Sequence, residues 1–251
     1  MLKSRLISVA RSSRGVTRSY HSVDHPTSNQ IVNSKSVESK ILTKALDYIP
    51  KFGFESICIT QAIRDMGYAD SLESSVTSNP IGTPEFQLMY HWLKVQRQNL
   101  EQLVVDPKSE FHQIRDEYDR VSYLIKKRLE FNVPIINKLG KGLGQLVVPY
   151  NINRGMEELH NLSDDISFYA GDRSNDFAWY SKRLSLSSVY VSSELFMLQD
   201  SSPEFKKTME FVDNKVQGIN DLGNAYNNVE QWGLFNAITL VNLIKSQLLR
   251  G

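Results

Sequence analysis

Apolar residues recur at helical spacing almost everywhere beyond residue 36, and this periodicity is the feature that most restricts the possible folds. The first run consists of Val37, Ile41, Ala45, Leu46 and Ile49. Steps of three or four residues place side chains on one face of an α-helix, whereas a half-buried strand alternates at every second residue. No stretch shows strand alternation and no internal repeat is present. The sequence therefore predicts an all-α fold.

Proline, glycine and capping residues mark the expected helix ends. The expected helices span about 37–49, 55–66, 70–76, 84 to beyond 100, 111–129, 154–169, 174–198, 203–222 and 228–250. Pro84 and Pro203 are suited to a first helical position, where the missing N–H costs no hydrogen bond, and Ser202 is the expected cap. The glycine-rich LGKGLGQ (139–145) is expected to be a turn. It is not a nucleotide-binding loop, because no strand precedes it and no Ser or Thr follows its Gly-Lys pair.

The first three helices form a head of about residues 37–80 with a glycine-containing turn, as in a helix-turn-helix. Followed by a larger helical domain at 81–222, this order resembles the tetracycline-repressor architecture. A helix that meets DNA phosphates needs Lys, Arg and polar donors. Residues 55–79 instead hold four acidic residues against Arg64 alone, and the chain has a net charge of +1. We therefore expect no nucleic-acid binding, and a DNA-binding regulator remains the alternative.

The N-terminal segment has the composition of a mitochondrial targeting sequence. Residues 1–22 are rich in Arg and Ser, with apolar residues between the basic ones, and no acid precedes Asp24. Such a segment predicts a transit peptide, with a plain basic tail as the alternative, and residues 23–36 follow as a polar linker. Cys58 is the only cysteine, so no disulfide can form within the chain.

Signatures of catalysis are missing from the sequence. It contains no HExxH, CxxC or GxSxG motif. Glu157 and His160 have the Glu-x-x-His spacing of helical diiron proteins, but such a site needs two of these pairs and two further glutamates. We expect no metal, no cofactor and no catalysis, and an enzyme with an unrecognised helical-pocket site remains the alternative.

Acidic and aromatic residues cluster in residues 162–202, which contain the motifs SDDISFYAGD, DFAWYSKR and LFMLQDSSP. Together with ALDYIPKFGFESICITQAIRDMGY (45–68) and VNLIKSQLLRG (241–251), they resemble the coenzyme Q biosynthesis protein nine family. The resemblance covers most of the chain after about residue 40. It implies a non-catalytic lipid-binding protein of ubiquinone biosynthesis, located in the mitochondrial matrix and peripheral on the inner membrane.

The resemblance also implies a surface that docks the diiron demethoxyubiquinone hydroxylase of the ubiquinone-synthesis complex. The residues of this expected partner patch are Asp164, Asp165, Ile166, Trp179, Tyr180 and Arg183. Trp179 and Tyr180 are consecutive, so on a helix they point about 100° apart and one of them is expected to be exposed. The alternative is that the pair only fixes the loop to the core.

A cavity for an isoprenoid quinone intermediate or another lipid is implied within the second domain. The expected lining residues are Tyr118, Val121, Ile125, Leu186, Val189, Tyr190 and Phe196. Apolar stripes of this kind also occur in an ordinary filled core, and the sequence does not separate the two alternatives.

The C-terminal segment, about 228–251, is predicted to be an amphipathic helix. The residues expected at its contact surface are Trp232, Leu234, Leu240, Val241, Ile244, Lys245 and Leu248. A spanning helix needs about 20 mainly apolar residues, and this segment is too short and too polar. We expect it to lie on anionic inner-membrane lipid or in the interface of a homodimer or higher oligomer, with a core helix as the alternative.

Overall fold

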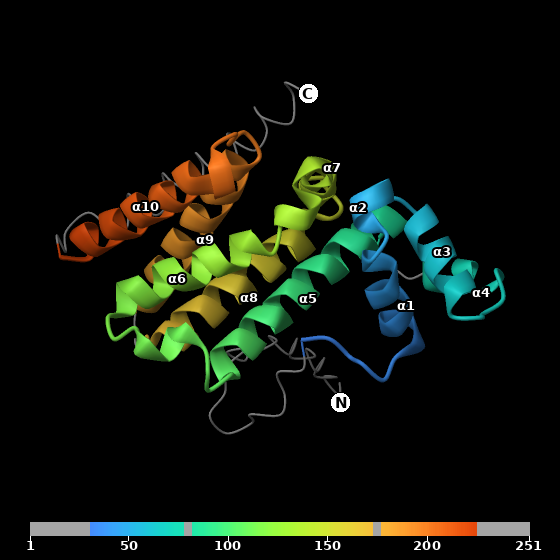
Figure 1. Cartoon of the computed structure of the whole chain (residues 1–251), viewed down its shortest axis with the longest axis horizontal. Coiled ribbons are helices and arrows are strands. Elements are labelled where there is room, and N and C mark those ends of the chain that lie inside the picture. Colours follow the sequence, from blue (N-terminus) through green and yellow to red (C-terminus); the bar gives the residue numbers. More distant parts are fainter. Residues whose placement is uncertain (1–30, 78–81, 173–176, 225–251) are drawn as a thin grey trace, which may run out of the picture.

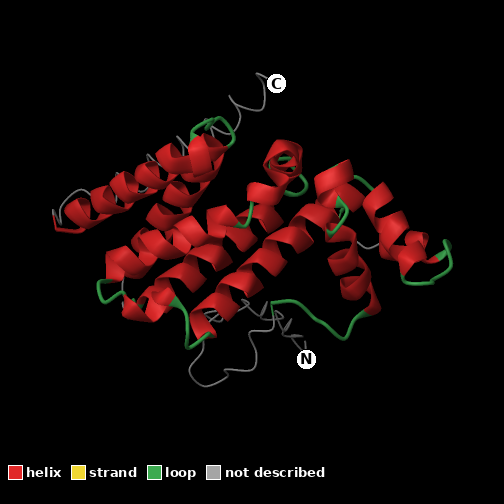
Figure 2. Ribbon diagram, in the orientation of Figure 1, coloured by secondary structure: helices red, strands yellow, loops and turns green. Residues whose placement is uncertain are grey.

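The computed structural model describes residues 31–77, 82–172 and 177–224 of the chain (Figure 1). The predicted transit peptide and the predicted C-terminal amphipathic helix lie outside these residues. Every regular element within them is a helix (Figure 2). The all-α prediction is therefore confirmed.

Ten α-helices and three short 3-10 helices make up the described part of the chain. The α-helices are α1 (Val37–Leu46), α2 (Ile49–Phe52), α3 (Ile57–Asp65), α4 (Leu72–Thr77), α5 (Pro84–Val105), α6 (Glu117–Glu130), α7 (Ile136–Leu146), α8 (Ile152–Ala170), α9 (Phe177–Met197) and α10 (Lys206–Asn224). The 3-10 helices are η2 (Glu110–Gln113), η3 (Val133–Ile135) and η4 (Pro203–Phe205).

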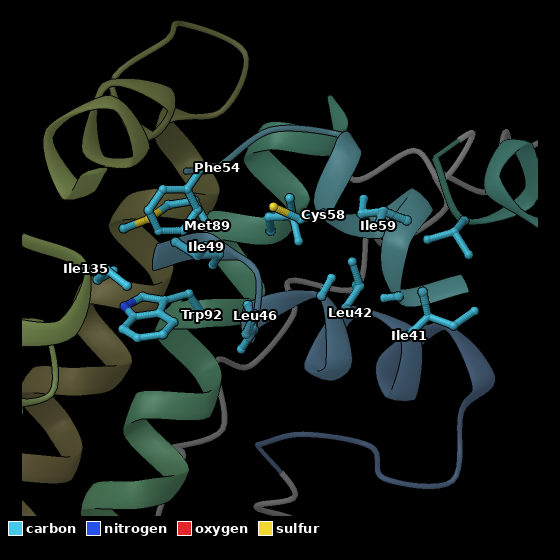
Figure 3. Packing of buried hydrophobic residues seen from close by; sticks show 14 of the residues in the cluster. Ile41, Leu42, Leu46, Ile49, Phe54, Cys58, Ile59, Met89, Trp92 and Ile135 are labelled. Atoms are coloured by element: carbon cyan, nitrogen blue, oxygen red, sulfur yellow. The ribbon is translucent and has the colours of Figure 1, made fainter. Parts of the chain in front are cut away.

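Two apolar cores lie along the long helix α5. The first core joins α1–α4 to the first half of α5 and to α7, and Figure 3 shows Phe54, Met89 and Trp92 within it. The second core joins the last part of α5, at Leu100, to α6, α8, α9 and α10. Because α5 contributes to both cores, it connects the small head to the larger helical layer (Figure 1).

Capping residues explain where α5 and α6 begin. The Thr83 hydroxyl accepts a hydrogen bond from the N–H of Phe86, and Pro84 occupies the first turn, as predicted for α5. The single helix predicted over 111–129 is wrong, because Phe111 lies in η2 and the Asp116 carboxylate caps a new helix at Glu117. A side-chain acceptor at this position satisfies N–H groups that the first turn leaves unpaired.

Two further helix boundaries differ from the prediction. Pro50 does not end the first helix but lies in the first turn of the separate helix α2. The helix predicted from Pro203 begins only at Lys206, because Glu204 and Phe205 have φ values of 52° and 55°, which interrupt the helix. The Asp200 carboxylate caps α10 there, accepting from both the N–H (2.9 Å) and the hydroxyl (2.6 Å) of Thr208.

The glycine-rich segment 139–145 is helical, so its prediction as a turn is wrong. It forms most of α7, which packs against α5. A Cβ added at Gly142 would lie 2.6 Å from the ring of Phe54 and 2.7 Å from the sulfur of Met89. Glycine is therefore required for close packing against the first core, although it is a poor helix former.

Substitution of two glycines of α7 should have opposite effects on stability. We expect Gly142→Ala to lower the free energy of unfolding by about 1–3 kcal/mol, because the added methyl overpacks a buried contact. Gly140 has no atom within 4 Å of an added Cβ. Gly140→Ala should therefore raise stability by about 0.5–1 kcal/mol through helix propensity. Urea unfolding of both variants tests this, and equal effects would contradict the packing explanation.

His91 on α5 is buried against α1 and should make stability depend on pH. Its Nε2 lies 2.8 Å from the Thr43 hydroxyl, and burial lowers the pKa of His91 from 6.5 to about 4, with Lys94 adding to the effect. Since the folded state disfavours the protonated ring, stability is retained above pH 6.5 and lost as the pH falls toward 4. The full loss is roughly 3 kcal/mol. His91→Gln should remove that slope in urea titrations, and an unchanged slope would contradict the assignment.

Candidate functional site

Helix α8 is enclosed by its neighbours at the motif that the sequence singles out. All six residues from Leu162 to Ser167 are buried, so no side of the helix faces solvent there. Helices α5, α6 and α9 pack around it. Two acidic side chains thus lie inside the protein, and each needs a partner because an unpaired buried charge is costly.

Arg97 on α5 neutralises Asp165, one of these two acids, together with Glu158 one turn or more earlier on α8. Its Nη1 donates to Oε1 of Glu158 (2.8 Å), and its Nε donates to Oδ2 of Asp165 (2.7 Å). All three side chains are at most 3% exposed. Burial raises the pKa of Glu158, and the positive charge of Arg97 opposes that shift. One guanidinium thus links α5 to two turns of α8.

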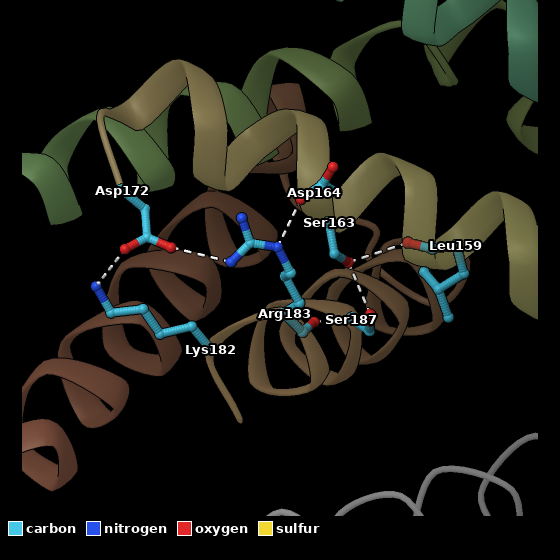
Figure 4. Close-up of polar contacts among 7 residues, drawn as sticks. All are labelled: Leu159, Ser163, Asp164, Asp172, Lys182, Arg183 and Ser187. Carbon is cyan, nitrogen blue, oxygen red and sulfur yellow. Dashed lines mark hydrogen bonds and ion pairs between the residues drawn. The ribbon is translucent and has the colours of Figure 1, made fainter. Parts of the chain in front are cut away.

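Arg183 on α9 neutralises the other acid, Asp164 (Figure 4). Its Nε donates to Asp164 (2.6 Å) and its Nη1 to Asp172 (2.9 Å), which follows the Gly171 turn. The neighbouring Lys182 donates to Asp172 (3.1 Å) and to Glu117 of α6 (2.9 Å). These contacts join three helices beside the turn that the sequence predicted between α8 and α9.

A second buried polar network, centred on Asn132, joins the two cores. Its Oδ1 accepts from Nη1 of Arg128 (3.0 Å) and from Nε1 of Trp92 (3.4 Å), and its Nδ2 donates to Glu194 (2.7 Å). The Tyr190 hydroxyl donates to the same Glu194 oxygen (2.7 Å). Burial raises the pKa of Glu194, and the charge of Arg128 opposes that shift.

Sequence reasoning missed this network. Arg128 belongs to a run of basic residues for which the sequence suggests only a favourable position near a helix end. In the structure it is 1% exposed, and Asn132 is fully buried. No local pattern marks the network, because Asn132 also contacts Trp92 and Glu194, which lie 40 and 62 residues away in the sequence.

The structure contradicts part of the partner patch. Asp164, Asp165, Ile166 and Arg183 are at most 4% exposed, so they cannot form a docking surface. The ion pairs with Arg97 and Arg183 are the physical reason, because they make burial of the two acids possible. The assignment of these four residues to an exposed partner patch is therefore wrong.

The two aromatic residues of the expected patch, Trp179 and Tyr180, are not buried in the same way as far as the structure describes them. Tyr180 is 67% exposed, which agrees with the expectation that one of the two aromatic residues faces solvent. Trp179 lies in α9, but its side chain is outside the described part of the structure. Docking of a partner at Tyr180 stays a prediction.

Most of the expected lipid-lining residues pack in the second core. Val121, Ile125, Leu186, Val189 and Tyr190 are all buried there. A ligand cavity at these positions stays a prediction.

Two of the expected lining residues lie away from the centre of that core. Tyr118 is half-buried, and Phe196 is 38% exposed, with its ring stacked on Phe211 at 4.8 Å between centroids.

An open pocket of about 600 Å³ lies elsewhere, where α6 ends and α10 begins. Its lining is Glu130, Val133, Pro203, Glu204, Phe205, Lys206 and Met209. It includes none of the seven expected residues.

Glu157 and His160 both lie exposed on α8. Within residues 31–77, 82–172 and 177–224, no group of three His, Cys, Asp or Glu side chains is placed to hold a metal ion. None of the helices in these ranges is both long enough and apolar enough to cross a membrane.

Comparison with known proteins identifies relatives of this chain. The protein-family model described as COQ9 matches residues 152–223, which contain α8, α9 and nearly all of α10. The chain is similar to "Ubiquinone biosynthesis protein COQ9, mitochondrial" of Saccharomyces cerevisiae, with 34% identity over 228 residues covering 86% of each chain. It is also 34% identical to the Schizosaccharomyces pombe protein of that name, over 92% of this chain and 87% of the relative. The human relative is 29% identical over 84% of this chain and 68% of its own length.

Proposed function

The chain belongs to the COQ9 family, and on that basis we propose that it acts in mitochondrial ubiquinone biosynthesis as a lipid-binding accessory protein. It binds an isoprenoid quinone intermediate at the matrix side of the inner membrane and presents it to the diiron demethoxyubiquinone hydroxylase. The protein itself carries out no covalent chemistry in this proposal. The similarity to mitochondrial ubiquinone biosynthesis proteins over most of the chain is the observation that carries it.

The second core supports the lipid-binding part of the proposal. Val121, Ile125, Leu186 and Val189 form an apolar interior between α6 and α9. Keeping an isoprenoid tail out of water is worth about 25 cal/mol per Å² of apolar surface. Tyr190 lies where this interior meets the Asn132 network, so hydrogen-bonding groups suited to a quinone ring adjoin the apolar region.

Exposed aromatic side chains support the partner-binding part. Tyr180 at the start of α9 is 67% exposed and Phe168 near the end of α8 is 47% exposed. Exposed aromatic residues of this size often contribute most of the binding energy of a protein interface. The proposed contact with the hydroxylase is therefore this end of α8 and α9, without the buried acids.

Restoration of ubiquinone in living cells tests the proposal. The full chain is expressed in Saccharomyces cerevisiae that lacks its own COQ9 relative, and ubiquinone is measured by mass spectrometry. We expect the wild-type chain to restore ubiquinone and Tyr180→Ala to restore much less at equal protein level. Tyr150→Ala is the matched control, because Tyr150 is 69% exposed but lies between α7 and α8. A wild-type chain that accumulates in mitochondria without restoring ubiquinone would contradict the proposal.

A further inference from the structure

The open pocket between the end of α6 and the start of α10 has largely apolar walls. Its volume of about 600 Å³ lies within the range of about 300–1,000 Å³ that is typical of small-molecule sites. Four of its seven lining residues are apolar, namely Val133, Pro203, Phe205 and Met209. Methionine is flexible and adapts to ligands of irregular shape. The pocket therefore suits an apolar ligand.

The charged residues of the lining lie at the rim of the pocket. Glu130, Glu204 and Lys206 are all exposed, and Glu130 pairs with Lys127 at 2.8 Å. No charged side chain of the lining is buried, whereas a site for a polar ligand holds a few precisely placed polar groups inside. An apolar chain therefore fits this lining better than a polar head group does.

Phe205 connects the pocket to the second core. Its half-buried side chain lines the pocket and also packs against that core. The second core is the apolar interior to which the proposed function assigns an isoprenoid quinone intermediate. An apolar chain that extends from the pocket toward this interior therefore meets the Phe205 ring.

The backbone at Phe205 adopts a conformation that its sequence does not favour. Glu204 and Phe205 have φ values of 52° and 55°, in the left-handed region that is unfavourable for residues with a Cβ. The sequence instead predicts a continuous helix from Pro203 with Ser202 as its cap. Disagreement between local preference and observed conformation is expected at strained or functional sites.

Hydrogen bonds to Asp200 hold the interrupted backbone in place. The Asp200 carboxylate accepts from the N–H of Ser202 (2.8 Å) before η4 and from the N–H of Thr208 (2.9 Å) after it. Backbone strain persists where surrounding contacts fix it in this way. One side chain thus holds both ends of the segment that carries Phe205.

Ser202 can cap this segment in two conformations. Its hydroxyl accepts from the N–H of Lys207 (3.1 Å) in the interrupted form. In a continuous helix from Pro203, the same hydroxyl would accept from the N–H of Glu204 or Phe205. Both forms therefore have a capped helix start, and a ligand that binds one of them better changes their populations.

We propose that the pocket binds one end of an isoprenoid chain, and that Phe205 moves aside when residues 203–205 join α10 as a continuous helix. The chain then extends from the pocket into the second core. This inference rests on the proposed function, which supplies the isoprenoid ligand. The interrupted form closes the path to the core, and the chain selects the continuous form.

Photolabelling of the full chain locates the bound probe. Two analogues of geranylgeraniol are used, one with a diazirine near the hydroxyl and one with a diazirine at the opposite end. After irradiation, mass spectrometry identifies the labelled residues. We expect one analogue to label the pocket, at Val133 or Met209, and the other to label second-core residues such as Leu129 or Val212.

A matched pair of substitutions at Glu204 tests the role of the backbone. Glu204→Gly removes the cost of the left-handed conformation and disfavours a helix, so it favours the interrupted form. It should weaken geranylgeraniol binding by about tenfold, because a smaller fraction of the protein is competent to bind. The same variant should unfold at a higher urea concentration. Glu204→Gln removes the charge but keeps a side chain, and it should bind geranylgeraniol as the wild type does.

The opposite signs of these two effects separate the proposed mechanism from damage to the fold, which would lower both binding and stability. Met209→Trp fills the pocket and should abolish labelling there. Met156→Trp is its control, because Met156 is 49% exposed on α8 and does not line the pocket.

Each contrary outcome has a distinct meaning. Labelling of the second core without the pocket would overturn the pocket proposal and leave lipid binding intact. No labelling anywhere in the wild-type chain would contradict the lipid-binding part of the proposed function, and this inference with it. Unchanged binding or lower stability of Glu204→Gly would overturn the role of the interrupted backbone. Palmitic acid that competes as strongly as geranylgeraniol would overturn the assignment of an isoprenoid chain.

Discussion

Arg97→Met is expected to lower the free energy of unfolding at pH 7 by about 3–5 kcal/mol, because it leaves two buried carboxylates without their cation. Arg97 pairs with Glu158 and Asp165, and all three side chains are almost completely buried. Methionine fills much of the arginine's volume, so the loss reflects charge more than a cavity. Urea unfolding at pH 7 measures the effect.

The penalty should also depend on pH. Burial already raises the pKa of Glu158, and loss of Arg97 removes the charge that opposes this shift. An acid whose pKa is raised on folding weakens the folded state as the pH rises above its unfolded pKa of about 4.3. The difference between wild type and Arg97→Met should therefore be small near pH 4 and grow toward pH 7.

A matched variant separates charge from packing. The triple variant Arg97→Met, Glu158→Gln, Asp165→Asn removes both carboxylate charges and should recover most of the stability. An Arg97→Met protein within 1 kcal/mol of wild type at pH 7 would contradict the importance of the pair, since removing one partner of a buried ion pair normally costs about 3 kcal/mol or more.

Asn132→Leu is expected to lower the free energy of unfolding by about 3 kcal/mol, because it leaves several buried polar groups without a partner. Asn132 accepts from Arg128 and Trp92 and donates to Glu194. Trp92 belongs to the first core, whereas Glu194 lies on α9. The substitution should thus weaken the connection between the two cores as well as the total stability.

Asn137→Leu is the control for this prediction. Asn137 lies exposed on α7, five residues further along the chain, and a surface substitution there should change stability by no more than about 0.5 kcal/mol. Far-UV circular dichroism during urea unfolding compares the two. If both variants were equally stable, the Asn132 network would contribute nothing measurable to folding.

Local patterns were sufficient for the fold class and for several helix starts. The recurrence of apolar residues at three- and four-residue steps predicts helices, and Pro84 correctly predicts the start of α5. These features depend on residues that are neighbours in the sequence. Gly142 shows the limit, since the preference of glycine suggests a turn, whereas the residue lies within α7, where close contacts with Phe54 and Met89 leave no room for a Cβ.

The candidate site was harder to predict because its contacts are distant in sequence. Asp164 and Asp165 are adjacent and look like an exposed acidic pair. The partner of Asp165 is Arg97, 68 residues away, and the partner of Asp164 is Arg183, 19 residues away. Only the packing of α5 and α9 around α8 brings these charges together, and no spacing rule contains that information.

Mass spectrometry of lipids that copurify with the full chain tests the central claim most directly. We predict isoprenoid quinone species bound to the wild-type protein and retained by Tyr180→Ala, since Tyr180 lies on the surface and not in the apolar core. A protein that is folded and active in restoring ubiquinone, but carries no isoprenoid lipid in either form, would contradict the claim that it binds and presents a quinone intermediate.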